Sequence, residues 1–173
     1  MWHEGTANIV DVATLGPDFM GFIFYPHSPR YVGEAFDMPT LPPDIQKVGV
    51  FVNDSVPTMM ELARNASLDY IQLHGYESVE KCELMKSAGY KIIKAFGIDE
   101  TFDFKALQYY RDVVNYFLFD TKGKHYGGNA TSFDWSLLKR YEEEAPYFLS
   151  GGLSPENVEG IVELNDKRLF AVD

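Results

Sequence analysis

The 173 residues of the chain are 46% hydrophobic and 15% aromatic, enough apolar material to bury a core, which disfavours an intrinsically disordered protein. The 26 acidic side chains outnumber the 15 basic ones, and the net charge of −11 favours solubility and disfavours nucleic acid or an anionic membrane as a partner. A single cysteine, Cys82, excludes an internal disulfide and a multi-cysteine metal site, and no apolar run reaches the roughly 18 residues that span a bilayer, so we expect a cytoplasmic protein.

Seven short runs of β-branched and aromatic residues recur along the chain, and each is followed by a turn and then by apolar residues at helical spacing. Ser55 and Ser78 stand at two expected helix starts, and Ser154 with Pro155 behind it stands at a third, as helix caps do. The predicted strands are residues 19–25, 47–52, 70–73, 91–96, 116–120, 147–150 and 169–173.

Strands that are apolar on both faces and alternate with helices indicate a parallel sheet with crossover connections. Two architectures fit this pattern, a doubly wound sheet and a (β/α)8 TIM barrel, and the number of units favours the barrel. The most irregular stretch, residues 38–43, contains three prolines but is too short to separate domains. We therefore expect an α/β fold of the TIM-barrel type, formed as a single domain over residues 1–173.

In a parallel barrel the functional groups come from the carboxyl ends of the strands and from the loops that follow them. The residues at these positions are more polar than packing alone would require, and we predict that Gln72, His74 and Asp173 line a substrate site. The full set is residues 25–30 (YPHSPR), Asn53, Gln72, His74, Gly75, residues 120–123 (DTKG), 126–128 (YGG) and 150–153 (SGGL), and Asp173.

Residues 150–157 (SGGLSPEN) run from a predicted strand through Gly151 and Gly152 into a predicted helix start. Such a segment can present free backbone N–H groups to an anion, and so predicts a phosphate site. An ordinary turn, in which glycine supplies a positive φ, explains the same pattern equally well. The place of these glycines, seventh in the barrel, favours phosphate, because barrel phosphate sites commonly use the loops after strands seven and eight.

Asp120 ends the apolar run YFLF of residues 116–119, and apolar neighbours favour the protonated carboxyl group that a general acid requires. A helix cap or an ion-pair partner for Lys122 is the alternative. Arg30 lies on a loop stiffened by two prolines, where its guanidinium could bind a substrate carboxylate through two hydrogen bonds. A solvated surface arginine explains Arg30 equally well.

The remaining chemically reactive residues favour packing roles. Cys82 lies within a helical pattern at residues 80–85, which is typical of a small core thiol rather than of a nucleophile. The four histidines show none of the His, Asp and Glu spacings of a metal site, so no metal is expected. Trp135 begins a predicted helix and is more typical of packing than of recognition.

Six motifs, taken in their order along the chain, closely resemble those of phosphoribosylanthranilate isomerase. They are GFIFYPHSPRY (21–31), VGVFVN (48–53), QLHG (72–75), FDTK (119–122), FDW (133–135) and LSGGL (149–153). The resemblance implies a barrel enzyme of tryptophan biosynthesis that converts N-(5-phosphoribosyl)anthranilate to 1-(2-carboxyphenylamino)-1-deoxyribulose 5-phosphate. The implied reaction is an Amadori rearrangement of a small phosphosugar, an aldose–ketose isomerisation that needs neither a metal nor an organic cofactor.

The resemblance implies that Asp120 is the acid that protonates the ring oxygen, that Arg30 lies near the anthranilate carboxylate, and that Gly151 and Gly152 lie near the phosphate. A base must then remove the C2 proton to give an enolamine, which tautomerises to the ketone. In the family this base is a cysteine in a Cys-Gly-Met-type motif at the end of the first strand, and Met1 stands where the Met of that motif would be. We therefore expect the catalytic cysteine just upstream of Met1, and a barrel that lacks its first strand and last helix.

Those two losses would leave one seam with unpaired strand edges, which a partner chain could cover, so we expect a monomer or a homodimer. Residues 127–132 (GGNATS) depart from the family, which has a second Gly and a Lys before the FDW motif. A non-catalytic barrel remnant or phosphosugar-binding module is the alternative function, since the chain alone is expected to be a poor enzyme. Another phosphosugar barrel, such as an epimerase or indole-glycerol-phosphate synthase, is disfavoured by Arg30 and by the context of Asp120.

Overall fold

The computed structural model describes residues 5–121 and 134–173. Residues 122 and 123, the predicted rim segment 126–128, the departure at 127–132 and Phe133 of the FDW motif lie outside the described residues. The strands are β1 (Phe19–Ile23), β2 (Gln46–Phe51), β3 (Tyr70–Leu73), β4 (Lys91–Ile98), β5 (Tyr116–Thr121), β6 (Tyr147–Leu149) and β7 (Leu169–Val172). The helices are α1 (Gly5–Ala13), α2 (Val56–Asn65), α3 (Val79–Ser87) and α4 (Val158–Leu164), with 3-10 helices η1 (Phe104–Tyr109) and η2 (Trp135–Arg140).

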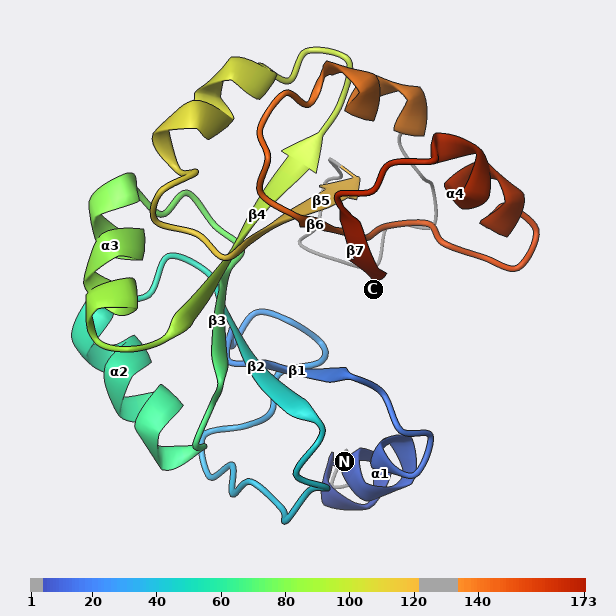
Figure 1. Cartoon of the computed structure of the whole chain (residues 1–173). Coiled ribbons are helices and arrows are strands. Elements are labelled where there is room, and N and C mark those ends of the chain that lie inside the picture. The colour runs from blue at the N-terminus through green and yellow to red at the C-terminus, as the bar shows by residue number, and fades with distance from the viewer. Residues whose placement is uncertain (1–4, 122–133) are drawn as a thin grey trace.

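All seven strands pair in parallel, and each lies beside its neighbour in the chain, in the order β1-β2-β3-β4-β5-β6-β7. A doubly wound sheet would reverse its strand order partway, so this uninterrupted order is that of a barrel wall. The sheet is strongly curved, with the helices on its convex side and β1 and β7 at its two edges (Figure 1). The seven predicted strands are therefore confirmed, each to within a few residues at its ends.

The connections differ more from expectation than the strands do. Ser55 and Ser78 cap α2 and α3 as predicted, their hydroxyl oxygens accepting backbone N–H groups at 3.2 and 3.4 Å. Residues 24–45 form turns without a helix, because prolines recur there and remove helical N–H donors. After β4 and β5 the described helices are of the 3-10 type rather than α-helices, and Trp135 begins the second of them.

The predicted start of the helix between β6 and β7 is wrong by three residues. α4 begins at Val158 with Asn157 at its N-cap, whereas Ser154 and Pro155 belong to the preceding turn. The Asn157 amide folds back onto that turn, where its oxygen accepts from the Ser154 N–H (2.9 Å) and its nitrogen donates to the Gly152 carbonyl (2.8 Å). These two hydrogen bonds stabilise residues 152–157 as a turn, so that the helix begins three residues later than predicted.

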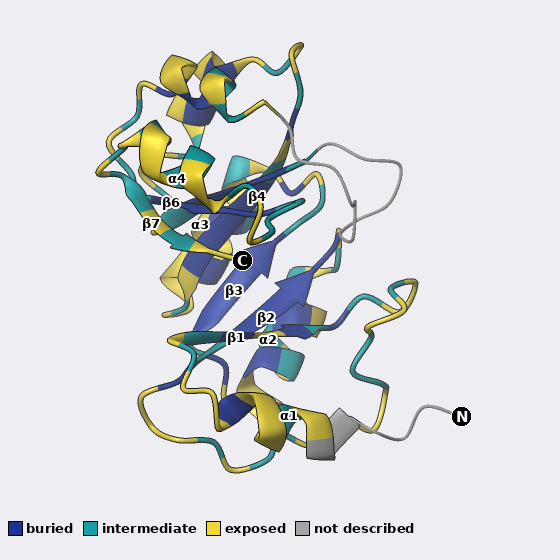
Figure 2. Ribbon diagram, turned by 90° about the vertical axis from the view of Figure 1, so that its right-hand side faces the viewer, coloured by how far each residue is buried: buried dark blue, intermediate teal, exposed yellow. Residues whose placement is uncertain are grey.

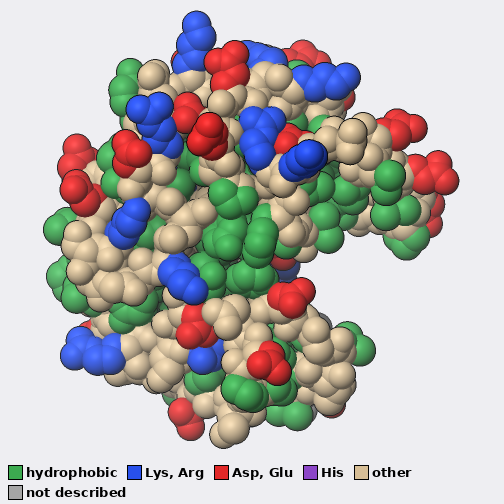
Figure 3. All heavy atoms as spheres, in the orientation of Figure 1, with side chains coloured by type: hydrophobic (Ala, Val, Ile, Leu, Met, Phe, Trp, Pro, Cys, Tyr) green, Lys and Arg blue, Asp and Glu red, His purple; other side chains and the backbone are tan. Residues whose placement is uncertain are grey.

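The sheet separates two apolar layers, because alternate residues of a strand point to opposite faces. The larger layer lies between the sheet and the helices and contains the phenylalanines of alternate positions, such as Phe117 and Phe119. The smaller one fills the concave face and includes Tyr70, Leu118 and Phe148. Figure 2 shows the strands between the two edges, β2 to β6, as the most buried part of the sheet, and Figure 3 shows hydrophobic side chains gathered at the centre of the curve.

Aromatic rings on the concave face link the two edges of the sheet. Phe19 of β1 contacts Phe148 of β6 and Phe170 of β7, at ring-centroid distances of 5.2 and 6.0 Å. Edge-to-face contacts of this kind add to the apolar area that the rings bury. They therefore support the curvature that brings the strand ends around a common centre. Among the described helices, none has the length and apolar character needed to cross a bilayer.

Candidate active site

The predicted site residues lie along one rim of the curved sheet, where the parallel strands end. Gln72 lies near the end of β3. Its side chain points to the same face of the sheet as that of Tyr70, which belongs to the concave apolar layer. Asp120 near the end of β5 shares its face with Leu118 of that layer. Strand alternation thus carries both polar side chains into the mouth of the barrel.

Gln72, His74 and Asp120 form a chain of polar contacts at this mouth. The Gln72 amide nitrogen lies 2.9 Å from Nδ1 of His74, and Nε2 of His74 lies 3.5 Å from an Asp120 carboxylate oxygen. An amide nitrogen can only donate, so in this orientation Nδ1 accepts and the imidazole proton sits on Nε2, facing Asp120. The fold therefore brings Gln72 and His74, at the end of β3, into contact with Asp120, near the end of β5.

Asp120 is 6% exposed, and both of its oxygens have neighbours. One oxygen accepts the backbone N–H of Thr121 at 2.7 Å, and the other faces His74. Asp120 lies inside β5 and caps no helix, which removes one alternative, while Lys122 lies outside the described residues. The carboxyl group is thus buried, hydrogen-bonded and directed into the mouth.

The Gly151–Gly152 turn lies directly against this carboxyl group. Both glycines have positive φ, +88° and +68°, which side-chain-bearing residues adopt only with strain. A Cβ atom on Gly151 would come within 2.5 Å of an Asp120 carboxylate oxygen and 2.6 Å of the Thr121 hydroxyl. Within the described part of the chain, the N–H groups of these two glycines have no hydrogen-bond acceptor. The turn is therefore both a close neighbour of Asp120 and a source of free donors.

Asp173 and Arg30 occupy the outer parts of the same rim. An Asp173 carboxylate oxygen accepts the Ser150 hydroxyl at 3.2 Å, which joins the end of β7 to the glycine turn after β6. Arg30 is exposed on the loop after β1, where its backbone N–H donates to the Ser28 hydroxyl at 3.2 Å. Among the described residues, no hydrogen bond or ion pair joins Arg30 to Asp120, His74 or Asp173.

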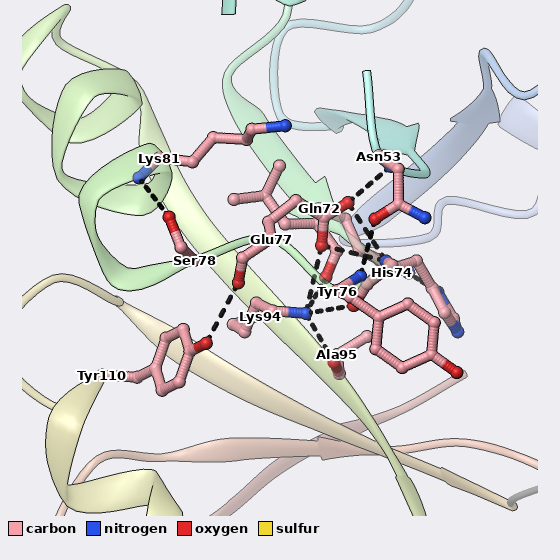
Figure 4. A network of polar contacts seen from close by, with 12 residues as sticks. Asn53, Gln72, His74, Tyr76, Glu77, Ser78, Lys81, Lys94, Ala95 and Tyr110 are labelled. Atoms are coloured by element: carbon pink, nitrogen blue, oxygen red, sulfur yellow. Dashed lines mark hydrogen bonds and ion pairs between the residues drawn. The ribbon is translucent and has the colours of Figure 1, made fainter. Parts of the chain in front are cut away.

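Two charged residues that the sequence analysis passed over lie beneath this site. Glu77, in the loop between β3 and α3, and Lys94 of β4 are 2% and 1% exposed and form an ion pair of 3.2 Å (Figure 4). Burial lowers the pKa of Lys94 below its usual range, and the Glu77 carboxylate opposes part of that shift. A lysine within the otherwise apolar strand IIKAF (92–96) was the signal that could have revealed the pair.

Cys82 is fully buried in the helix-side layer, as predicted for a core thiol. Burial raises its pKa to about 11, so that at pH 8 only about one thiol in a thousand is ionised. We expect iodoacetamide to leave the folded chain unmodified at pH 8 over a period that labels it fully in urea, as mass spectrometry would show. Rapid stoichiometric labelling of the folded chain would contradict the buried position.

Within the described part of the chain, no three or more His, Cys, Asp or Glu side chains are grouped so that they could hold a metal ion. The polar groups of the rim are instead spaced along several strand ends, with a buried carboxyl at the centre. This arrangement can bind a small molecule by hydrogen bonds and transfer a proton to it.

The chain is similar in sequence to known isomerases. The family model for N-(5'phosphoribosyl)anthranilate (PRA) isomerase matches residues 3–173. The isomerase of that name from Parabacteroides distasonis is 45% identical over 96% of this chain and 77% of its own length.

Solved structures of the same enzyme share the fold. A phosphoribosyl anthranilate isomerase in complex with reduced 1-(o-carboxyphenylamino)-1-deoxyribulose 5-phosphate superposes with a TM-score of 0.76, at 34% identity over 98% of this chain and 82% of that one. Monomers generated from the dimeric enzyme of Thermotoga maritima give a TM-score of 0.69, at 32% identity over the same shares of both chains, 98% and 82%. The chain, with seven parallel strands curled into a half-barrel, belongs to the phosphoribosylanthranilate isomerase family.

Proposed function

We propose that the chain acts in tryptophan biosynthesis on N-(5-phosphoribosyl)anthranilate, which it rearranges to 1-(2-carboxyphenylamino)-1-deoxyribulose 5-phosphate. The observation that carries the proposal is the buried carboxyl of Asp120, which faces the His74 imidazole on one side and the Gly151 turn on the other. Family membership supplies the reaction, and this cluster supplies a group able to begin it. We further propose that the chain works in the cytoplasm as a single domain, either alone or as a homodimer like the Thermotoga maritima enzyme.

In the proposed reaction Asp120 donates its proton to the ring oxygen of the sugar while the bond from that oxygen to C1 breaks, leaving an iminium at C1. His74, whose Nε2–H faces Asp120, stabilises the carboxylate that remains. Removal of the C2 proton then gives the enolamine, which tautomerises to the ketone. The N–H groups of Gly151 and Gly152 bind the phosphate, and Arg30 receives the anthranilate carboxylate.

Among the described residues of the rim, none is a cysteine that could remove the C2 proton. The only cysteine of the 173 residues is Cys82, which is buried on the helix side of the sheet and keeps its proton at neutral pH. We therefore propose that the 173 residues by themselves turn over slowly. We also propose that their seven strands correspond to seven of the eight strands of a complete barrel, because β1 and β7 form the free edges of the described sheet.

The test compares the purified chain with one extended upstream by a strand ending in Cys-Gly. Turnover is followed by the anthranilate fluorescence, and binding of the reduced product analogue by calorimetry. We expect both chains to bind the analogue and the extended chain to be faster by several orders of magnitude. Equal rates would contradict the missing base, and failure of both chains to bind and to turn over would overturn the function.

A phosphosugar-binding module without catalysis is the second candidate, and the buried position of the single cysteine is the observation that favours it. The same experiment separates the two functions. Binding of the analogue by both chains, without turnover in either, would select the binding module.

A further inference from the structure

The Glu77–Lys94 pair lies on the helix side of the sheet, outside the barrel mouth. Lys94 alternates along β4 with Ile93 and Ala95, which line the concave face, so its side chain points the opposite way. Both charged groups are almost fully buried, and among the described residues neither bonds to the side chain of Gln72, His74 or Asp120. Any effect of the pair on the reaction must therefore pass through other residues.

The pair forms hydrogen bonds with the backbone on both sides of His74 (Figure 4). The Lys94 ammonium donates to the carbonyl oxygens of Leu73 at 3.0 Å and Gly75 at 2.8 Å. The Glu77 carboxylate accepts the Gly75 N–H, with its two oxygens at 2.9 and 3.1 Å. Both peptide groups attached to the His74 α-carbon are thus bonded to one or the other member of the pair.

The same ion pair anchors this segment to the neighbouring strands. Glu77 also accepts the backbone N–H of Asn53 at 2.8 Å, and Lys94 also donates to the carbonyl of Ala95 at 2.9 Å. The His74 N–H itself donates to the carbonyl of Phe51 at 2.9 Å. With its backbone fixed in this way, His74 can keep its ring between the Gln72 amide and Asp120.

Stability alone is a weak explanation for such a pair. Removing two charges from water is costly, and well-packed apolar replacements of a buried ion pair are often neutral or stabilising. A role in fixing the backbone conformation around His74 explains the burial of the pair better, because its hydrogen bonds to the backbone there are directional and charge-assisted.

We propose that Glu77 and Lys94 are positioning residues: through the two peptide groups that flank His74, they hold its imidazole in the orientation that faces Asp120. The catalytic consequence rests on the proposed function, whereas the orientation of the ring does not. A disturbed backbone at His74 would move the imidazole away from the acid, and displacements of about 1 Å at a reacting centre can cost about a hundredfold in rate.

The test uses Lys94→Met, Glu77→Gln and the double variant Glu77→Gln/Lys94→Met. The single variants leave a buried charge without its partner and are expected to be strongly destabilised, whereas the double variant has no unpaired charge and is expected to fold. Arg168→Met is the matched control. Arg168 donates to Asp166 at 2.7 Å and to the Tyr141 carbonyl at 2.8 Å, at the amino end of β7 and away from the rim.

Two readouts decide the outcome, and thermal unfolding accompanies both. Nitrogen-15 NMR of the imidazoles, with the His74 signals assigned by their loss in His74→Gln, reports the tautomer whether or not the chain turns over. In the parent we expect one tautomer, with the proton on Nε2. In the double variant we expect a tautomer mixture and, in the chain extended by the Cys-Gly strand, a kcat lowered tenfold to a hundredfold with KM changed less than threefold.

The Arg168→Met control is expected to lower the unfolding temperature and to leave both the imidazole spectrum and kcat unchanged. A folded double variant with the parent's tautomer and kcat would overturn the proposal and leave the pair a purely structural role. If the chain extended by the Cys-Gly strand shows no turnover, the proposed catalysis fails, but the NMR comparison still decides whether the pair orients His74.

Discussion

Replacing Asp120 with asparagine is expected to lower kcat/KM by about 10²- to 10⁴-fold, the range that a general acid typically contributes. Asparagine fills the same volume and its oxygen can still accept the Thr121 N–H, so the local fold should survive. It has no proton that it can give to the sugar ring oxygen. The measurement is steady-state turnover in the chain that carries the upstream Cys-Gly strand, with analogue binding measured in parallel.

Asp103→Asn is the matched control for this change. Asp103 caps η1 by accepting the Lys105 N–H at 3.1 Å on the exposed outer side, and asparagine caps helices as well as aspartate does. We expect the control to keep full activity. If Asp120→Asn retained activity within threefold of the parent, the acid would have to be sought elsewhere, and His74, with its Nε2–H in the mouth, would be the next candidate.

The residues of the rim could be predicted from sequence, because the parallel topology of the sheet determines which residues lie there. Once the apolar runs are assigned to parallel strands, the residue after each run must lie at the same end of the sheet, and Asp120, Gln72 and Asp173 are found there. Hydrophobic pattern does not determine how closely these groups approach. The 3.5 Å contact of His74 with Asp120 depends on sheet curvature and on loop conformation, neither of which a single strand encodes.

The connections and the buried pair show where pattern-based prediction ends. Residues 24–45 carry partly buried apolar side chains such as Phe36 and Met38, yet form no helix, because tertiary packing of a proline-interrupted segment replaced local helix formation. Lys94 and Glu77 are 17 positions apart (94 − 77), and only the fold shows that they meet. Solvated surface charges, which are far commoner, look the same in a sequence.

Replacing Gly151 with alanine is expected to combine a stability loss with a large fall in activity. The new Cβ would have to avoid the Asp120 carboxylate, 2.5 Å away, and the backbone nitrogen of Thr121, 2.8 Å away, so that the turn or the acid must move. Strain at φ +88° adds to this clash. We expect a loss of about 3 kcal/mol in the free energy of unfolding and a fall of more than tenfold in kcat/KM.

Gly89→Ala is the control that separates the backbone strain of a positive φ from the clash of a new Cβ with its neighbours. Gly89, after α3, has a similar φ of +96°, but a Cβ there meets nothing within 4 Å. Its replacement is expected to cost only the strain, about 1 kcal/mol, and to leave activity unchanged. Chemical denaturation and turnover of the two variants, measured side by side, then isolate the contact between the glycine turn and the acid. If both variants lost the same stability and kept full activity, the turn would not constrain Asp120, and the glycines would serve the backbone alone.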